Sequence, residues 1–202
     1  IKMNIKHSLD LLNPTALKIL RLFFRFDQQF TGRKISTFCG LNNKTCNDYL
    51  IELVNNDILN RVGVGKAYLY TVNKTRIWNE LIVPVLELEE KTYSKFCNRI
   101  KRVFTPFSTD IIVFGSYARD TQSSDSDFDL CLMVKKNSKA LKETSDAFSA
   151  QALEDYNLVV SVHAIEYKKS SKLTYKTLLK NIKKSGQWLA GNKREFETWL
   201  RK

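Results

Sequence analysis

Residues 111–134 read IIVFGSYARDTQSSDSDFDLCLMV, and this stretch decides the fold of the C-terminal half of the chain. Two apolar runs, residues 111–114 and 130–134, are predicted strands separated by a turn of small residues. Side chains alternate across a strand, so Asp127 and Asp129 lie on one face. Two carboxylates this close together need a cation, and Mg²⁺ (or Mn²⁺) prefers such ligands together with phosphate oxygens.

The turn of small residues offers partners for those phosphate oxygens. Gly115 lets the backbone come close to a phosphate. Ser116 supplies a hydroxyl and, if a helix begins there, free N–H groups. The turn and the acidic pair together predict a site for a metal-bound triphosphate, and the alternative is a tight turn followed by a solvated acidic edge.

The combined pattern is Gly-Ser-x-Ala-Arg from residue 115, followed by Ser-Asp-x-Asp-x-Asp-Leu from residue 124. It resembles the minimal nucleotidyltransferases of the DNA polymerase β-like superfamily. The resemblance implies transfer of a nucleoside monophosphate from a nucleoside triphosphate, with ATP as the expected donor, to a hydroxyl of a protein, an RNA or a small molecule. It also implies roles for Asp127 and Asp129 as catalytic metal ligands, for Gly115 and Ser116 in binding the nucleotide, and for Arg119 as an added positive charge.

Enzymes of this kind hold two metals with three carboxylates, and the third acid usually lies in the neighbouring strand. Here that predicted strand, residues 158–165, offers Ser161 and His163 at the third position and no acid. Glu166 lies at or beyond the strand end, and Asp125 is expected to be solvated in the loop. The alternative function is therefore a DNA-binding regulator or antitoxin-like protein whose transferase domain binds nucleotide but is weakly active or inactive.

Residues 1–75 are interpreted as a separate unit of three helices and a β-hairpin. The expected helices begin at Pro14 and cover residues 33–39 and 44–55, and the expected strands cover residues 58–62 and 67–72. This order resembles a winged helix-turn-helix domain, which lays one helix in the major groove of duplex DNA. The resemblance implies DNA contacts from Asn43, Lys44, Arg61 and Lys66. Dimerisation into a homodimer, or contact with another protein, is the alternative use of such a domain.

The whole chain is thus predicted to have an α+β fold with three parts. These are a winged helix domain over residues 1–75, a helical connector over residues 76–106 that Pro84 should kink or interrupt, and a small mixed-sheet nucleotidyltransferase domain over residues 107–202. The last part is expected to hold helices over residues 138–156 and 174–189. A lysine series could line one helix face, either solvated or as a track for triphosphate or nucleic acid: Lys169, Lys172, Lys176, Lys180 and Lys183.

The composition of the chain indicates what kind of partner it binds and in which compartment it is expected. The chain has 202 residues and a net charge of +12, which favours an anionic partner such as nucleotide or nucleic acid. No apolar run reaches the ~20 residues of a membrane span and no signal peptide is evident, so we expect a cytoplasmic protein without a membrane partner. The scattered cysteines predict free thiols rather than a zinc site or disulfides: Cys39, Cys46, Cys97 and Cys131.

Overall fold

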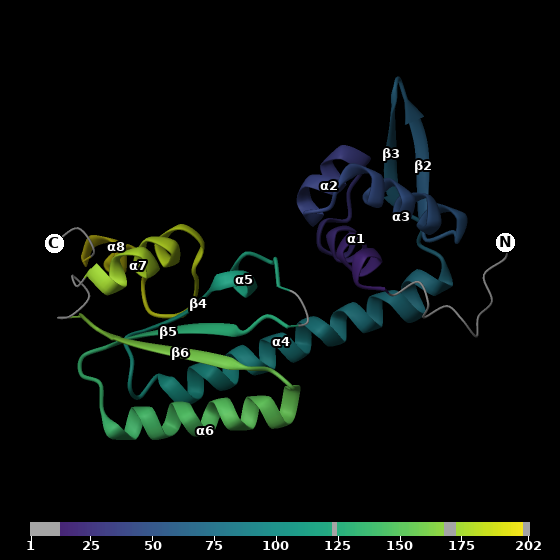
Figure 1. The fold of residues 1–202 in the computed structure, drawn as a ribbon. Helices are drawn as coiled ribbons and strands as arrows, with labels where there is room; N and C mark the ends of the chain where they lie inside the picture. Colours follow the sequence, from purple (N-terminus) through teal and green to yellow (C-terminus); the bar gives the residue numbers. More distant parts are fainter. Residues whose placement is uncertain (1–12, 123–124, 168–172, 200–202) are drawn as a thin grey trace. The chain divides into compact units, whose positions relative to one another are not determined.

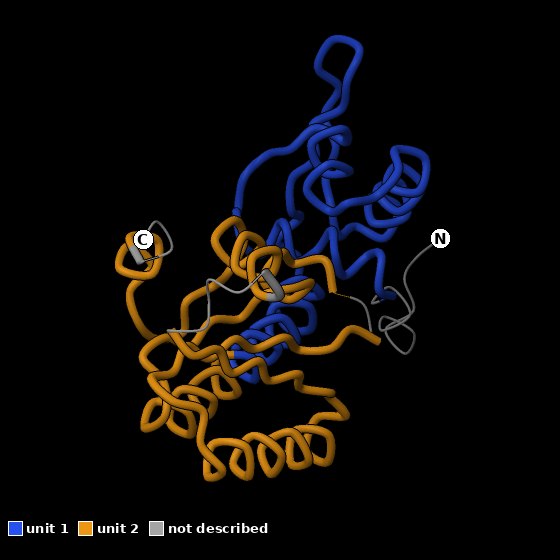
Figure 2. The backbone as a smooth tube through the Cα atoms, turned by 60° about the vertical axis from the view of Figure 1, so that its left-hand side comes forward, with its two compact units in different colours: residues 1–93 blue, residues 94–202 orange. Residues whose placement is uncertain are grey.

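The computed structural model describes residues 13–122, 125–167 and 173–199. The chain divides into two compact units, residues 1–93 and 94–202 (Figure 2). Each unit has its own sheet and its own apolar core.

The first unit is a winged helix, as predicted. Its sheet is antiparallel, with the strand order β1-β3-β2 (Figure 1). The sequence pattern does not predict β1, because two residues are too few to show an alternation. The elements in chain order are α1 Pro14–Phe26, β1 Phe30–Thr31, α2 Gly32–Cys39, α3 Asn43–Asn55, β2 Leu59–Val64 and β3 Ala67–Val72.

Local sequence explains where these elements begin and end. The side chain of Asn13 caps α1 by accepting hydrogen bonds from the backbone N–H groups of Thr15 and Ala16, at 3.1 and 2.9 Å. Gly40 ends α2 with φ of +62°. Gly65, with φ of +59°, is the first of two turn residues between β2 and β3, which is the glycine position of a type II′ hairpin turn.

The helix after the hairpin begins irregularly. Trp78–Ile82 forms a π-helical turn, η2, and α4 follows over Val83–Phe104. Pro84 lies in the first turn of α4 and has no N–H to donate to the preceding turn. The wider turn just before it is closed by a bond from the Val83 N–H to the Trp78 carbonyl. The expected interruption at Pro84 is therefore confirmed.

Helix α4 contributes to both apolar cores. Leu86 is buried in the core of the first unit, and Phe96, Ile100 and Phe104 are buried in the core of the second. Every residue from 87 to 95 is exposed. The stretch of α4 between the two sets of core residues therefore contributes no buried side chain, although Glu89 within it accepts hydrogen bonds from Arg21 of α1.

The second unit is built on a mixed four-stranded sheet in the order β6-β5-β4-β7. Strands β5 and β6 run parallel, and the other two pairings are antiparallel. The predicted mixed sheet and α+β class are confirmed. The elements are β4 Asp110–Phe114, α5 Gly115–Ala118, β5 Phe128–Val134, α6 Lys139–Tyr156, β6 Val160–Glu166, α7 Leu173–Ser185, β7 Gln187–Ala190 and α8 Lys193–Trp199.

Both faces of this sheet are covered, which explains the unbroken apolar run of β5. Leu130 and Leu132 point to the face where α4 and α6 pack, with Phe148 of α6 in the same core. Cys131 points to the opposite face, where Leu179 of α7 joins it (Figure 1). All four cysteines are free.

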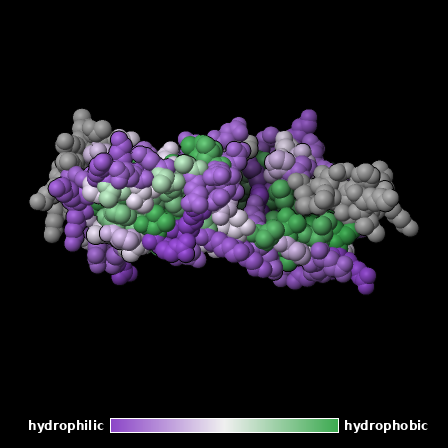
Figure 3. Space-filling model, turned by 90° about the horizontal axis from the view of Figure 1, so that it is seen from below, coloured by the Kyte–Doolittle hydropathy of each residue, from purple (hydrophilic) through white to green (hydrophobic). Residues whose placement is uncertain are grey.

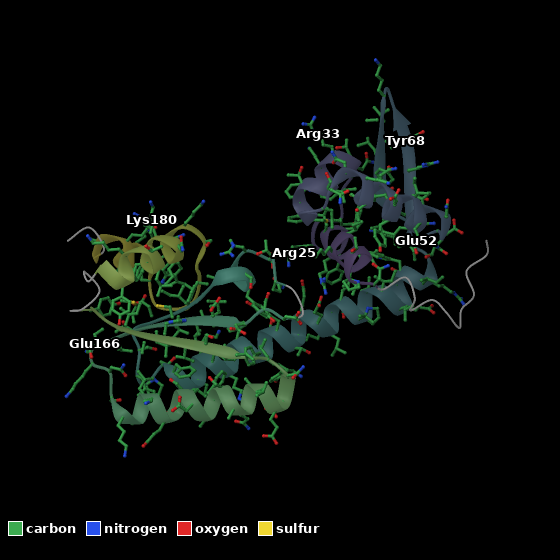
Figure 4. The ribbon with its side chains drawn as sticks, viewed as in Figure 1. Arg25, Arg33, Glu52, Tyr68, Glu166 and Lys180 are labelled. Carbon is green, nitrogen blue, oxygen red and sulfur yellow. The ribbon has the colours of Figure 1, made fainter. Side chains whose placement is uncertain are left out.

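The end of the chain differs from the sequence prediction. The pattern predicts one helix over residues 174–189, but α7 ends at Ser185 and residues 187–190 form β7 along β4. Gly186 permits the change of direction, because a Cβ there would lie 2.6 Å from the Ile182 carbonyl oxygen and 2.9 Å from Ile112. Lys169 and Lys172 lie outside the described residues, whereas Lys176, Lys180 and Lys183 lie on α7, where Lys180 points away from the sheet (Figure 4).

The surface carries some apolar groups among its polar ones. Figure 3 shows one face on which hydrophilic side chains predominate and apolar ones gather in patches. In the second unit the large apolar side chains that stay exposed include Leu153, Tyr156 and Val159. Along the ranges that the structure describes, no helix is both long and apolar enough to cross a lipid bilayer.

Candidate active site

Gly115 admits a carboxylate that a side chain in its place would displace. It follows β4 directly with φ of +72°, and Phe114 is paired across the sheet with Asp129. A Cβ built on Gly115 would lie 2.0 Å from Oδ2 of Asp129 and 3.0 Å from its Cγ. The sequence pattern assigns this glycine to the approach of a phosphate. The structure adds a second requirement, that of seating the Asp129 carboxylate against the backbone.

The two predicted acids lie at the start of β5. Asp127 is exposed one residue before the strand, and Asp129 is partly buried within it, while Phe128 between them is fully buried on the other face. Burial raises the pKa of Asp129, and the negative charge of Asp127 raises it further. The neighbouring His163 and Arg119 act on the pKa of Asp129 in the opposite direction. These four groups are therefore electrostatic neighbours.

The predicted nucleotide-binding residues meet at the same end of β5. Helix α5 is a single turn, and the Ser116 carbonyl accepts the N–H groups of Arg119 and Thr121 at 3.1 and 3.0 Å. Gln187 ties this turn to β7 by donating from Nε2 to the Ala118 carbonyl at 3.2 Å. The structure thus brings Gly115, Ser116 and Arg119 beside the acidic pair, as the motif indicates.

Helix α7 adds positive charge nearby. Its last turn carries Lys183 and Lys184, and the helix contacts α5. Because residues 187–190 return directly along β4, the last turn of α7 is the end that lies next to α5. An anionic ligand over the acidic pair would therefore approach a cationic helix end.

The third position holds no acid. Ser161 is the direct neighbour of Asp129 across the parallel pair β5 and β6, and His163 is the neighbour of Cys131 on the same face. The His163 side chain is exposed, and its ring packs edge-on against Phe114 with centroids 5.5 Å apart. Glu166 lies at the far end of β6, where its carboxylate accepts the N–H of Asn137.

The acidic pair could bind a cation that is also coordinated by a phosphate, rather than one coordinated by protein side chains alone. Among residues 13–122, 125–167 and 173–199, no three or more His, Cys, Asp or Glu residues are grouped so that they could hold a metal ion. Asp127 and Asp129 supply two carboxylates, and Mg²⁺ is usually bound by one or two carboxylates together with substrate phosphates and water. The residues present therefore fit Mg²⁺ or Mn²⁺ carried in with a triphosphate.

A family comparison identifies this unit. Residues 92–189 match the model of the nucleotidyltransferase domain family. This part of the chain is a nucleotidyltransferase domain. The match includes the Gly-Ser turn, the acidic pair and both parallel strands.

Solved structures give weaker likenesses to this chain. A toxin-antitoxin structure with AMP-PNP is 18% identical, with a TM-score of 0.40, over 52% of this chain and 81% of that one. A tri-AMPylated Shewanella oneidensis HEPN toxin in complex with MNT antitoxin is 16% identical, with a TM-score of 0.37, over 52% and 78%. HlyU from Vibrio cholerae is 18% identical, with a TM-score of 0.36, over 46% and 99%. No curated protein matches the sequence.

A buried acid in the nucleotidyltransferase domain was not anticipated from sequence. Asp110 begins β4 at the end remote from Gly115 and is 5% exposed. Its carboxylate accepts the Asn192 N–H at 3.0 Å, the Thr109 hydroxyl at 3.2 Å and the Tyr167 hydroxyl. Burial and the bond to Asp110 raise the pKa of Tyr167 to about 12. These bonds fix the last strand and helix to β4, so Asp110 is structural.

The predicted DNA-binding residues lie on separate elements of the winged helix. Asn43 contacts the buried Ser36 of α2 at 2.7 Å, so it holds the helix junction. Lys44 is exposed in the first turn of α3, and Lys66 is exposed at the tip of the hairpin. The Arg61 guanidinium lies 4.9 Å from the ring centre of Tyr68.

Helix α3 is not uniformly basic. Its exposed side includes Asp48 and Glu52 around Ile51, and these residues line a surface pocket with Asn55 and Asn56. Figure 4 shows Glu52 on this helix and Tyr68 on the hairpin. The predicted DNA-contacting cations are Lys44 at the start of α3 and Arg61 and Lys66 on the hairpin.

Proposed function

We propose that the nucleotidyltransferase domain transfers a nucleoside monophosphate, with ATP as donor, to a hydroxyl acceptor on a protein, an RNA or a small molecule. The observation that carries the proposal is the Asp129 carboxylate seated against Gly115 with Asp127 two residues upstream on the same face. A divalent cation held by these carboxylates would neutralise phosphate charge in such a reaction. Free thiols and use of ATP both fit a cytoplasmic protein.

The residues of this site would have the following roles. Asp127 and Asp129 bind the cation, while Gly115 and Ser116 hold the triphosphate through the turn that begins α5. Arg119 adds positive charge beside them. The acceptor oxygen would bond to the α-phosphorus as the bond to pyrophosphate breaks, and the proton of the acceptor hydroxyl would pass to solvent. Because Ser161 and His163 stand where a third acid is expected, activation of the acceptor is weak and transfer is slow.

Calorimetry with Mg²⁺ and a non-hydrolysable ATP analogue tests the site. We expect saturable, Mg²⁺-dependent binding by the wild type and at least a tenfold loss of affinity in the double variant Asp127→Asn, Asp129→Asn. Asp125→Asn is the matched control, because it removes the same charge two residues upstream in the exposed loop. Equal affinity in the double variant and the wild type would falsify the proposed metal–nucleotide site.

A second candidate function is DNA-binding regulation with a weakly active or inactive transferase domain. It is favoured by the winged helix and by exposed cations at the start of α3 and at the hairpin tip. In this function Asn43 and Lys44 lie towards the major groove, and Arg61 and Lys66 contact flanking phosphates. Gel shifts of the full chain on random duplex should weaken steeply with salt. Lys66→Ala should weaken them further, whereas Lys91→Ala, on exposed α4, should not.

A further inference from the structure

Among the described strands, β2 leaves one edge of the winged-helix sheet without a neighbour. The sheet order is β1-β3-β2, so one side of β2 pairs with β3 and the other is the edge of the sheet. The hairpin projects from the three helices of its own unit (Figure 1). Natural edge strands usually carry a proline, a bulge or an inward charge that prevents pairing with another strand. Residues 59–64, LNRVGV, have no proline, and the pairing with β3 is continuous without a bulge. Their one charge, Arg61, is on the face of Leu59 and Tyr70, and its guanidinium is engaged within the hairpin, 4.9 Å from the centre of the Tyr68 ring.

The pairing with β3 determines which backbone groups face outward. Val64 and Ala67 flank the two-residue turn, so they exchange hydrogen bonds as a pair. Antiparallel pairs alternate, and Val62 is therefore also bonded towards β3. The N–H and C=O groups of Arg61 and Gly63 point to the open edge.

The outer sheet face next to this edge is apolar. Val62 and Val64 are 63% and 54% exposed and lie on the face opposite to the buried Leu59 and Tyr70. Ala67 and Leu69 stand beside them on β3, paired with Val64 and Val62. An apolar stripe alongside an open edge is a surface on which another strand gains both backbone bonds and burial.

We propose that the open edge of β2 pairs antiparallel with the same edge of a second copy of this chain, with the two-fold axis at Val62. This inference goes beyond the proposed transferase function and does not depend on it. In this register Val62 lies opposite Val62 of the second copy, and Arg61 lies opposite Gly63 of the second copy. Two Arg61–Gly63 pairs would then each exchange both backbone hydrogen bonds.

Charge and strand length select this register among the symmetric ones. Directly opposed residues must be of the same hydrogen-bonding kind, so the axis passes through a residue. An axis at Arg61 would set two guanidinium groups directly opposite each other, which is unfavourable. An axis at Gly63 would place Arg61 opposite Gly65. Gly65 is a turn residue with φ of +59°, so it cannot continue the strand pairing. The axis at Val62 avoids both and places a residue without a side chain opposite each arginine.

Engineered cysteines test the register in the full chain. In an antiparallel sheet, directly opposed non-bonded residues have Cα atoms about 4.5 Å apart, within the range of a disulfide. We expect Val62→Cys to form a covalent dimer under mild oxidation in most of the protein. Asn60→Cys is the matched control, because it lies on the same face two residues away. The two engineered cysteines at position 60 would be four residues apart along the paired strands, about 13 Å, which is too far for a disulfide.

Light scattering gives a second measurement that needs no new thiol. The wild-type chain should approach twice the monomer mass near 100 μM, a concentration of about the order that a weak dimer requires. Gly63→Pro removes an outward N–H and should give monomer, whereas Gly63→Ala keeps it. A Cβ at Gly63 would meet only Tyr68, at an ordinary 3.9 Å. Val62→Lys should also give monomer, and Leu88→Lys, equally exposed on α4, should not.

Each outcome bears on the proposal. A monomeric wild type at this concentration overturns it, as does cross-linking of Asn60→Cys as efficient as that of Val62→Cys. A dimer that survives both Gly63→Pro and Val62→Lys would place the interface elsewhere and also overturns it. Dimerisation lost in those two variants and kept in their controls, together with selective linking of Val62→Cys, supports it.

Discussion

Replacing Gly115 by alanine should strain the backbone and also displace the Asp129 carboxylate of the active site. The residue has φ of +72°, where a non-glycine residue costs about 1–2 kcal/mol. The new Cβ would lie 2.0 Å from Asp129 Oδ2, whereas real Cβ contacts are essentially never under 3.0 Å. The oxygen must therefore move by at least about 1 Å, and an off-rotamer side chain costs about 0.5–1.5 kcal/mol. Together these terms lower the free energy of unfolding by about 1.5–3.5 kcal/mol.

The same displacement of Asp129 should weaken ligand binding. A shift of about 1 Å at a positioned group costs about a hundredfold in function. We therefore expect Gly115→Ala to weaken Mg²⁺-dependent binding of a non-hydrolysable ATP analogue about a hundredfold, as measured by calorimetry. Gly40→Ala is the control, since Gly40 has φ of +62° and a Cβ added there would meet nothing within 4 Å. Denaturant unfolding of the control should show only the backbone cost of about 1–2 kcal/mol.

Two results would refute this reasoning. The first is wild-type affinity in Gly115→Ala, which would mean that the position of Asp129 against the turn does not matter for the ligand. The second is a loss of stability no greater than that of Gly40→Ala, which would mean that the carboxylate moves without cost.

Three further predictions concern acids of the nucleotidyltransferase domain. The pKa of Asp129 is raised in the folded state, so ionisation of this group lowers the free energy of unfolding as pH rises above the ordinary pKa of 3.8. In EDTA, Asp129→Asn should therefore be more stable than the wild type at pH 7. The difference between the two proteins should vanish below pH 3.8. Ser161→Asp adds an acid beside Asp129 and should tighten Mg²⁺-dependent nucleotide binding about tenfold by calorimetry, a gain that a remote Ser161 would not give. Asp110→Ala leaves the Asn192 N–H without its acceptor and should lower the free energy of unfolding by about 1–3 kcal/mol, whereas Tyr167→Phe, which keeps the carboxylate, should lower it less.

The local sequence pattern is sufficient to predict the long helices and strands but does not predict the short strands. Strand β5 is fully apolar over residues 130–134, and such a run has few alternatives when it is flanked by turns. Strand β7 has only four residues, and Trp188 and Leu189 continue the helical spacing of α7. What makes it a strand is pairing with β4, more than 70 residues earlier, together with the close packing at Gly186. Neither constraint is visible in a local window.

The same division holds for the site. The spacing of Asp127 and Asp129 indicates a shared face without any knowledge of the fold, because alternation is a property of one strand. The reason that residue 115 must be glycine depends on a carboxylate from another strand, so the motif identifies the residue but not its full role. The Asp110 cluster joins three segments far apart in sequence, and no local signal marks it.

The sharing of α4 between two cores has a practical consequence for dividing the protein. A fragment ending at residue 75 would lose Trp78, Ile82 and Leu86, all of which complete the core of the winged helix. A fragment beginning at residue 107 would lose Phe96, Ile100 and Phe104 from the other core. Separate expression of the halves should therefore cut inside the helix, within the exposed residues 87–95, where no buried side chain is removed from either product. A tag or protease site inserted there would fall among exposed side chains.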